Sequence, residues 1–310
     1  MFSLEESEVR EEIVSEMQTV GDVMRYLITT FDASDVFYGH GADNAFEEAQ
    51  LMLAPVLNLE FSEIEEFYDT RLTVRERKEI AEFAVKRIFE HIPTAYLTNI
   101  SWFCNIPFYV DERVLIPRSP IGELVKNRFE GYLPQDQESF QILDMCTGSG
   151  CIAIATAVTM DGAALVDAVD VSEDAIDVCY TNIENIGVEE LVTPIMSDLF
   201  EKLEGMSYDL IIANPPYVDE VDLNNMPEEY LHEPRLALES GEDGLDLTIR
   251  ILREAPKYMK EGAWLICEVG NSMVNLTARY PDYSFRFIEF KNGGNGVFAA
   301  TREELLSYQF

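Results

Sequence analysis

The segment Asn214-Pro215-Pro216-Tyr217 follows the apolar run YDLIIA, and its residue types suit the binding of an NH2 group. The side-chain oxygen of Asn214 accepts a hydrogen bond, and the carbonyl of Pro215 follows a backbone that the proline ring fixes. Two acceptors converging on one nitrogen would hold a planar amine or amide, and the aromatic face of Tyr217 would cover it. We predict that Asn214, Pro215 and Tyr217 are catalytic and that Pro216 joins them in binding the acceptor.

This arrangement addresses a specific chemical difficulty. An amide nitrogen is a poor nucleophile because its lone pair is delocalised into the carbonyl. Holding both of its hydrogens turns the lone pair towards an electrophile, so catalysis then depends on orientation and on stabilisation of a developing cation. A rigid turn that only ends a strand explains the two prolines but neither the Asn before them nor the aromatic residue after them.

A second motif, DMCTGSGCIAIA, has the order strand, glycine turn, helix. Gly148 and Gly150 remove side chains where the backbone bends and approaches a ligand. Asp170 ends the next strand, where its carboxylate is placed to accept hydrogen bonds from a ribose diol. The turn also fits the G-x-G-x-x-G/A fingerprint of dinucleotide binding, so the turn alone does not exclude NAD.

Two further acids favour a different cofactor. Asp144 lies inside the strand before the turn, where a carboxylate is unhelpful beside a pyrophosphate but useful near a cationic amine or sulfonium. Asp198 ends the following strand, where it either reaches an adenine amino group or caps a helix. The predicted cofactor-binding residues are Asp144, Thr147, Gly148, Ser149, Gly150, Cys151, Asp170, Val171, Asp198, Leu199 and Asn214.

The elements that carry these motifs alternate between strands and helices from residue 141 onward. Strand candidates are QILDMC, LVDAVDV, VTPIMSD, YDLIIANPPY, GAWLICEVG, FRFIEF and GVFAATR, and helix-like segments are 150–158, 172–186, 244–258 and 272–279. Several strands are apolar on both faces, as expected of parallel strands covered by helices. We predict a Rossmann-like, seven-stranded α/β domain. The linker KNGGNG is too short for a crossover helix, so the last strand must run antiparallel to its neighbour.

The part before this domain is predicted to be helical as far as residue 92. Apolar residues recur there at three- and four-residue steps, and Asn44–Glu47 and Thr73–Glu76 have the spacing of capping boxes. Residues 93–120 are rich in aromatic and β-branched residues and predict a β-hairpin linker. We therefore expect a small helical domain (1–92), the linker (93–120) and the α/β domain (121–310).

The chain is strongly acidic, with 58 Asp and Glu against 22 Lys and Arg and a net charge of −36. Such a field repels nucleic acids and anionic membranes and attracts a basic partner, although solubility or a salty environment explains the same charge. Residues 218–242, beside the NPPY segment, contain eight acids and one arginine. They predict a docking loop for a basic protein or a solvated acidic loop.

Other sequence features argue against disulfides, a metal site, a signal peptide and a membrane span. Five cysteines without a CxxC pair predict thiols in a reducing cytosol, and three scattered histidines predict no metal site. The acidic N-terminus lacks the apolar region of a signal peptide, and no apolar run approaches the length of a membrane span. We expect a cytoplasmic protein with no membrane or direct DNA partner.

On these motifs the chain resembles the class I S-adenosylmethionine-dependent methyltransferases with a (D/N/S)PP(Y/F/W) motif, and among them the protein glutamine methyltransferases. The resemblance covers the helical part, ERVLIPRSP, DMCTGSGCIAIA, NPPY and FKNGGNGVF. It is nearest to the branch that modifies the third protein of the large ribosomal subunit. In the branch that modifies release factors, an Arg-Pro-Asp-type continuation follows the arginine that corresponds to Arg118, whereas this chain has SPIGE.

The resemblance implies transfer of a methyl group from S-adenosylmethionine to a glutamine side-chain amide, leaving S-adenosylhomocysteine. It implies that the glycine turn and Asp170 bind the cofactor, that NPPY binds the glutamine and that the helical domain recognises the substrate. The expected partner is a basic ribosomal protein, free or in an assembly intermediate, with a release factor as the alternative. Arg118 is expected to contact the substrate backbone or the cofactor carboxylate, or to form a salt bridge in the linker. Glu268 is expected to be a buried supporting acid.

Three other functions are compatible with parts of the sequence. A nucleic-acid methyltransferase acting on an exocyclic adenine amine would flip out the base and favour a basic groove, which the charge opposes. A non-catalytic module with a retained cofactor pocket is disfavoured by the intact Asn214 and Tyr217. An NAD-dependent oxidoreductase would bind NAD tightly without binding S-adenosylmethionine.

Overall fold

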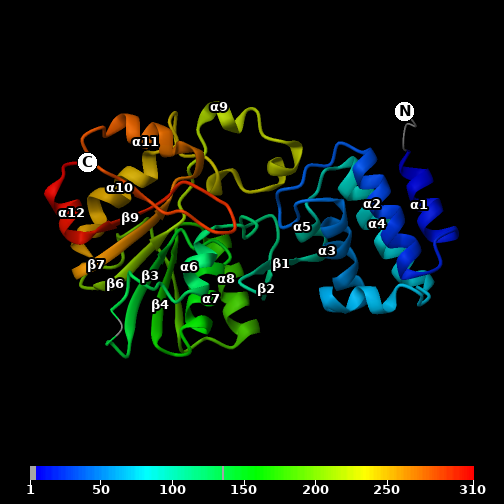
Figure 1. Cartoon of the computed structure of the whole chain (residues 1–310), viewed down its shortest axis with the longest axis horizontal. Coiled ribbons are helices and arrows are strands. Elements are labelled where there is room, and N and C mark those ends of the chain that lie inside the picture. The colour runs from blue at the N-terminus through cyan, green and yellow to red at the C-terminus, as the bar shows by residue number, and fades with distance from the viewer. Residues whose placement is uncertain (1–4, 135) are drawn as a thin grey trace. The chain divides into compact units, whose positions relative to one another are not determined.

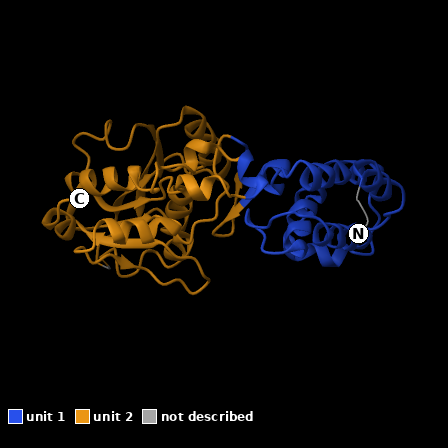
Figure 2. Cartoon of the chain, turned by 90° about the horizontal axis from the view of Figure 1, so that it is seen from above, with its two compact units in different colours: residues 1–101, 110–112, 227–232 blue, residues 102–109, 113–226, 233–310 orange. Residues whose placement is uncertain are grey.

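The computed structural model describes residues 5–134 and 136–310 (Figure 1). The chain folds into two compact units, which are coloured separately in Figure 2. The helical unit contains the residues up to Ser101 together with 110–112 and 227–232, and the α/β unit contains 102–109, 113–226 and 233–310. Each unit therefore draws on segments that are separated in sequence.

The helical unit is built from α1 (Glu6–Ser15), α2 (Val20–Ala33), α3 (Ala45–Leu57), the 3-10 helix η1 (Phe61–Phe67), α4 (Val74–Phe89) and α5 (Thr94–Thr98), with the short 3-10 helix η2 (Glu228–His232). Helix α1 packs against α4, and α2 packs against α3. The apolar residues that recur through the first part of the chain are divided between α1 and α2, because Thr19 begins a new helix by forming a capping box with Asp22.

Both predicted helix starts are present in this unit. Thr73 and Glu76 form a full capping box at α4. Asn44 caps α3 by accepting the Glu47 N–H at 3.0 Å, whereas the Glu47 carboxylate accepts the N–H of Asp43. These caps provide partners for N–H groups that the first helical turn leaves unpaired.

The predicted hairpin is present as β1 (Ile100–Phe103) and β2 (Ile106–Tyr109). Cys104 and Asn105 connect the two strands, and both have positive φ, as a type I′ turn requires. The short helix α5 precedes β1 and was not predicted from the sequence.

The α/β unit contains a seven-stranded sheet of the order β5-β4-β3-β6-β7-β9-β8. The strands are β3 (Phe140–Met145), β4 (Ala164–Asp170), β5 (Val192–Met196), β6 (Tyr208–Ala213), β7 (Met259–Glu268), β8 (Arg286–Phe287) and β9 (Val297–Thr301). Neighbours from β5 to β7 are parallel, and β9 runs antiparallel to both β7 and β8. The prediction of an antiparallel last strand is confirmed.

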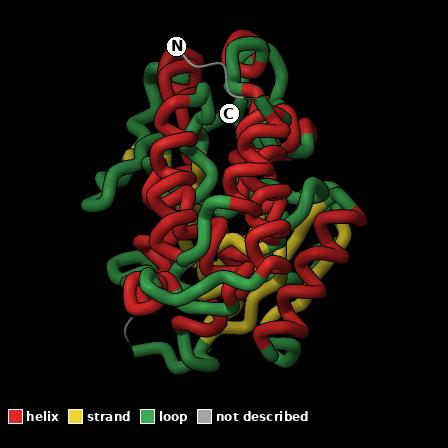
Figure 3. The backbone as a smooth tube through the Cα atoms, turned by 90° about the vertical axis from the view of Figure 1, so that its right-hand side faces the viewer, coloured by secondary structure: helices red, strands yellow, loops and turns green. Residues whose placement is uncertain are grey.

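Alternate residues of the central strands enter two separate cores. Ile142, Leu210 and Ile212 face one core, and Leu143, Ile211 and Ala213 face the other, as the two-residue period of a strand requires. Helices α6 (Ile121–Lys126), α7 (Cys151–Thr159) and α8 (Glu173–Ile186) supply residues to the first core, whereas α10 (Asp246–Glu254), α11 (Met273–Arg279) and α12 (Arg302–Ser307) supply residues to the second. Figure 3 colours all described helices red and all described strands yellow. The remaining short helices are α9 (Glu220–Leu223), η3 (Arg235–Ala237), η4 (Ala255–Lys257) and η5 (Gly270–Ser272).

The direction of strand connection reverses at β3, since β4 and β5 lie on one side of it and β6 lies on the other. Met145 at the end of β3 pairs with Ala213 at the end of β6. The glycine turn and the NPPY segment therefore leave the sheet side by side, at the kind of edge where open α/β sheets bind ligands. Across the described part of the chain, no helix combines the length and apolar character needed to cross a bilayer.

Candidate active site

A pocket in the α/β unit lies at the carboxyl ends of four parallel strands. Predicted site residues that line it are Arg118, Thr147, Gly148, Ser149, Cys151, Asp170, Val171, Asp198, Leu199, Asn214 and Pro216. Four other predicted residues, Asp144, Gly150, Pro215 and Tyr217, lie next to lining residues in sequence but do not line the pocket themselves. The structure thus brings together segments that follow β3, β4, β5 and β6.

The two glycines of the turn serve different purposes. Gly148 has φ +55°, and a Cβ built on it would meet no described atom within 4 Å, so the backbone borders open space. Gly150 has φ +80°, and its Cβ would lie 2.6 Å from Sγ of Cys179. Gly148 thus leaves room for a ligand to approach, whereas Gly150 allows α7 to pack closely against α8.

Asp170 connects the end of β4 to the glycine turn. Its Oδ2 accepts the N–H of Gly148 at 2.9 Å, and its Oδ1 accepts the N–H of Ser172 at 3.0 Å. Burial raises the pKa of Asp170, and these N–H donors oppose part of that rise. The carboxylate therefore shapes the turn in addition to lining the pocket.

Asp144 is 1% exposed and lies beneath the turn. Its Oδ2 accepts the Thr147 hydroxyl at 2.5 Å and the Ala153 N–H at 3.1 Å, whereas Oδ1 has no hydrogen-bond partner among the described residues. Burial raises the pKa of Asp144 to about 7. In this structure the carboxylate holds the glycine turn and the start of α7 together through these two hydrogen bonds.

Asp198 forms an ion pair with Arg250 at 2.9 Å, and both side chains are partly exposed. Residues 199–202 form turns, and Leu199 has φ +46°, so no helix begins there for Asp198 to cap. Of the two roles considered for Asp198, the helix cap is therefore wrong.

The acceptor motif begins with a buried polar atom that lacks a partner. The Asn214 N–H donates to the Met145 carbonyl at 3.3 Å, which holds the residue beside the end of β3. Its side-chain Oδ1 is buried and has no hydrogen-bond partner among the described residues. Buried acceptors in native proteins are almost always paired, so this atom is suited to receive a ligand N–H.

Tyr217 is held at its hydroxyl and at its carbonyl. The hydroxyl donates to Glu268 Oε1 at 2.9 Å, and the carbonyl accepts the Ser272 hydroxyl at 2.7 Å. Glu268 is 4% exposed, and its Oε2 accepts the Ser119 hydroxyl at 2.5 Å. Burial raises the pKa of Glu268, opposed in part by these two donors. The expectation of a buried supporting acid at position 268 is met.

Arg118 lines the pocket and also pairs with Glu233 through both oxygens of the carboxylate. Glu233 accepts the Ile116 N–H at 3.0 Å as well. A salt bridge of the linker, one of the roles considered for Arg118, is therefore present.

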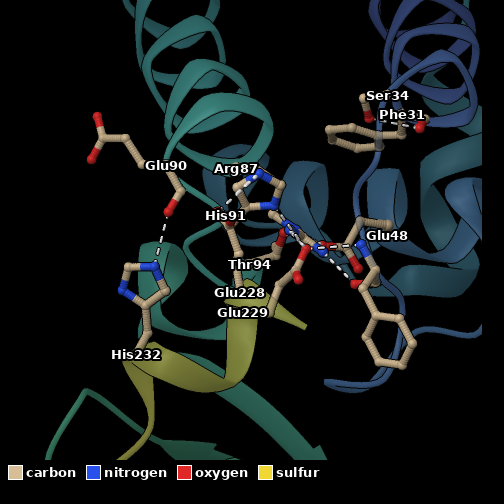
Figure 4. Close-up of polar contacts among 11 residues, drawn as sticks. Phe31, Ser34, Glu48, Arg87, Glu90, His91, Thr94, Glu228, Glu229 and His232 are labelled. Carbon is tan, nitrogen blue, oxygen red and sulfur yellow. Dashed lines mark hydrogen bonds and ion pairs between the residues drawn. The ribbon is translucent and has the colours of Figure 1, made fainter. Parts of the chain in front are cut away.

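Two acids of the segment 218–242 are structural, and the prediction that this segment acts as a docking loop is wrong for them. Glu233 pairs with Arg118 in the α/β unit. Glu229 lies in the helical unit, where it accepts from Arg87 Nη1 at 2.9 Å and from the Phe37 N–H at 2.8 Å (Figure 4). Buried carboxylates paired in this way are not available to an incoming basic protein.

The Arg87 guanidinium is the centre of a buried polar cluster in the helical unit. Its Nε donates to Glu48 Oε1 at 2.5 Å, and the same oxygen accepts the Thr94 hydroxyl at 2.6 Å. Arg87, Glu48 and Glu229 are all at most 3% exposed. The cluster joins α3 and α4 to the segment 227–232 (Figure 4).

Sequence reasoning missed part of the pocket lining. The missed residues are Arg113, Val114, Leu115, Pro117, Ser119, Met145, Cys146, Ile152, Val169, Ser172, Ala175, Ser197, Pro234, Leu236, Ala237 and Leu247. The linker residues lie in or beside the quoted motif ERVLIPRSP, which provided a signal for them. Pro234 precedes the 3-10 helix η3 (Arg235–Ala237), which is too short for a periodic pattern to indicate it.

Among the residues that the structure describes, no group of three or more His, Cys, Asp or Glu side chains is arranged to hold a metal ion. Burial raises the pKa of the Cys146 and Cys151 thiols beside the pocket. Neutral thiols of this kind pack as small apolar groups.

Comparisons with known proteins indicate the family. The model of the methyltransferase small domain family matches residues 132–243. The ribosomal protein uL3 glutamine methyltransferase of Neisseria gonorrhoeae is 45% identical over 291 residues, which cover 94% of this chain and 97% of that protein. The enzyme of the same name from Neisseria meningitidis is also 45% identical and covers 94% and 95%. A solved methyltransferase from Pyrococcus furiosus is 14% identical, with a TM-score of 0.45 over 74% of this chain and 99% of that one.

Proposed function

Because the chain belongs to the family of ribosomal protein uL3 glutamine methyltransferases, we propose that it transfers a methyl group from S-adenosylmethionine to the side-chain amide nitrogen of a glutamine in ribosomal protein uL3. Within the site, the observation that carries this proposal is the buried Oδ1 of Asn214, which has no partner among the described residues. It lies beside the pocket at the edge where the glycine turn and the NPPY segment meet.

In this proposal the acceptor amide is held by two oxygens. Asn214 Oδ1 takes one amide hydrogen, and the Pro215 carbonyl takes the other. Both contacts strengthen as positive charge develops on the nitrogen, which is the condition for lowering the barrier rather than only binding the substrate. Tyr217 covers the planar group. None of these residues has to act as a strong base, because an N-methylated amide cation releases its proton readily to water.

The cofactor would be held by the glycine turn, Asp170 and Asp198. Two observations support the fit: the open space at Gly148 and the position of Asp170 at the end of β4 in the pocket. When bound, S-adenosylmethionine supplies a methyl group on a positively charged sulfur and leaves as S-adenosylhomocysteine. The task of the protein is then to orient the amide nitrogen towards the methyl group.

A protein acceptor also agrees with the electrostatics of the chain. A net charge of −36 opposes the approach of nucleic-acid phosphates and favours a basic protein. The glutamine must enter the pocket as an extended side chain, so methylation is expected before that glutamine is packed in the ribosome, on free uL3 or on an assembly intermediate.

The direct test is to incubate the protein with methyl-labelled cofactor and undermethylated uL3 and to map the label by mass spectrometry. A release factor and an adenine-containing oligonucleotide are offered in parallel. We expect label on one glutamine of uL3 and none on the other two acceptors. Label on the release factor or the oligonucleotide without label on uL3 would overturn the proposal. Tight binding of NAD without binding of S-adenosylmethionine would also overturn it.

A further inference from the structure

The glycine-rich segment 292–296, NGGNG, packs against the backbone behind the acceptor motif. Gly296 has φ +73°, and its Cβ would overlap the Gly270 carbonyl and lie 2.6 Å from the Gly270 Cα. The Gly296 carbonyl accepts the Val269 N–H at 2.7 Å. Only a glycine at position 296 allows the two backbones to come this close.

Gly270 in turn supports the ring of Tyr217. It has φ +45°, and its Cβ would overlap the ring and lie 2.9 Å from Cδ2 and Cζ of Tyr217. The ring therefore lies directly on the Gly270 backbone, and Gly296 lies against that same backbone. Gly296, Gly270 and the Tyr217 ring therefore pack on one another in that order.

The hydroxyl end of the same ring is fixed by a buried carboxylate. Glu268 accepts the Tyr217 hydroxyl through one oxygen and the Ser119 hydroxyl through the other. Ser119 lines the pocket and Tyr217 follows the lining residue Pro216, whereas Glu268, Gly270 and Gly296 do not line it. The carboxylate and the two glycines can therefore affect the pocket only through the residues that they hold.

The segment 292–296 is also held against the residues that follow Arg118. A Cβ on Gly294 would lie 2.7 Å from Cβ of Pro120. The Glu123 carboxylate accepts the backbone N–H groups of Lys291 and Asn292 at 3.1 and 3.2 Å. These contacts hold the segment in place at its start and in its middle.

We propose that Glu268, Gly270 and Gly296 are positioning residues of the acceptor site, which act by fixing the orientation of the Tyr217 ring against the glutamine amide. This inference rests on the proposed function. Because none of the three lines the pocket, their loss lowers turnover while cofactor affinity is preserved. If the three residues had a purely structural role, their loss would lower stability, and turnover and cofactor affinity would fall together.

The first test is a double-mutant cycle with Tyr217→Phe and Glu268→Gln. Each single variant is expected to lower kcat about tenfold, because a ring that is held less firmly orients the amide less well. The double variant should be no slower than the slower single variant, because Tyr217→Phe removes the donor and Glu268→Gln removes the negative charge of the acceptor in the same hydrogen bond. Cofactor Kd should stay within about twofold of the wild-type value.

Tyr208→Phe is the matched control for this cycle. The Tyr208 hydroxyl also donates to a carboxylate, Asp167, at 2.8 Å, but it lies at the opposite end of β6. We expect its kcat to match that of the wild type. Additive effects in the cycle, or an equal loss of kcat in Tyr208→Phe, would overturn the inference.

The second test compares Gly296→Ala with Gly293→Ala. Both glycines have positive φ, +73° and +86°, so both variants carry similar backbone strain. A Cβ at 293 meets no described atom within 4 Å, whereas a Cβ at 296 overlaps Gly270. We expect kcat to fall at least about tenfold more in Gly296→Ala than in Gly293→Ala.

A readout that needs no substrate separates this inference from the proposed function. With 3-fluorotyrosine at position 217, the wild type should give one sharp ¹⁹F resonance. That resonance should broaden or split in Glu268→Gln and Gly296→Ala but not in Gly293→Ala. Failure of wild-type turnover on uL3 refutes the proposed function alone. An unchanged resonance in Glu268→Gln refutes the positioning role even if Gly296→Ala does not fold.

Discussion

Arg118 and Glu233 form a two-point ion pair, with Nη1 2.5 Å from Oε1 and Nη2 2.7 Å from Oε2. The side chain of Glu233 is fully buried, and that of Arg118 is 23% exposed. The pair connects the linker to residue 233, directly before the pocket-lining residues Pro234, Leu236 and Ala237. It therefore fixes one wall of the pocket.

Replacing one partner of this pair should destabilise the protein. Arg118→Met removes the guanidinium from a fully buried carboxylate and should lower the free energy of unfolding by about 3 kcal/mol. Glu233→Gln should cost less, because its amide oxygen still accepts a hydrogen bond and the exposed side of Arg118 reaches water. Urea unfolding at neutral pH measures both. An unchanged stability together with a raised KM would instead show that Arg118 serves substrate binding alone.

Asn214→Ala should strongly lower turnover. The variant removes the acceptor that holds the amide as charge develops, and we expect kcat to fall by about a hundredfold or more, with nearly unchanged cofactor binding by calorimetry. Asn214→Asp keeps an oxygen acceptor at the same position and should retain more activity than Asn214→Ala. Parallel loss of cofactor binding in Asn214→Ala would contradict the assigned role.

Asp170→Ala should show the reverse pattern. The carboxylate accepts the N–H groups of Gly148 and Ser172, so its loss releases the glycine turn and removes the group expected to bind the ribose. We predict a cofactor Kd at least about tenfold weaker, equivalent to one lost charged hydrogen bond. At saturating cofactor, kcat should be less affected. The prediction fails if kcat falls while Kd is unchanged.

Asp144 should make stability depend on pH. Burial raises its pKa from 3.8 to about 7, so the folded state holds the proton more tightly than the unfolded state. The stability from this group is fully present below pH 3.8 and is lost as the pH rises towards 7, by up to about 4 kcal/mol. Asp144→Asn does not titrate. Its stability relative to the wild type should therefore rise between pH 4 and pH 7 in urea unfolding, and a constant difference would refute the prediction.

Arg87→Met should lower the free energy of unfolding of the helical unit. It leaves Glu48 and Glu229 buried without the guanidinium and should cost about 3–5 kcal/mol. Hydrogen exchange should become faster in residues 227–232. Arg235→Met is the control, because its pair with Glu239 is exposed and such surface pairs contribute at most about 1 kcal/mol. Equal effects of the two variants would contradict the buried cluster as the cause.

Much of the α/β unit could be predicted from the sequence because its signals are local. Apolar runs bounded by Gly, Asn and Asp predicted all seven strands, and the glycine turn and NPPY indicated where two of them end. The switch at β3 then brings both motifs to one edge by general rules of connection. The linker 291–296 is too short for a crossover helix. This length alone predicted that β9 is antiparallel, as the structure shows.

The supporting contacts could not be predicted because they join residues far apart in the chain. Glu268 is 51 residues from Tyr217 and 149 from Ser119, and nothing local marks it as their shared acceptor. In the helical unit, Glu229 of the segment 227–232 pairs with Arg87, which lies 142 residues earlier in the chain. Asp144 was expected near a cationic ligand, but its hydrogen bonds to Thr147 and Ala153 can only be read from the folded turn.

The segment 227–232 makes the helical unit discontinuous in the gene. A chain cut after Ser101 would contain Arg87 and Glu48 but not Glu229, so it would begin with a buried site that is missing one of its acids. Transplanting the helical unit onto a related enzyme has to transfer residues 110–112 and 227–232 as well. An exchange of residues 1–101 alone would therefore leave the Arg87 cluster without one of its two carboxylates.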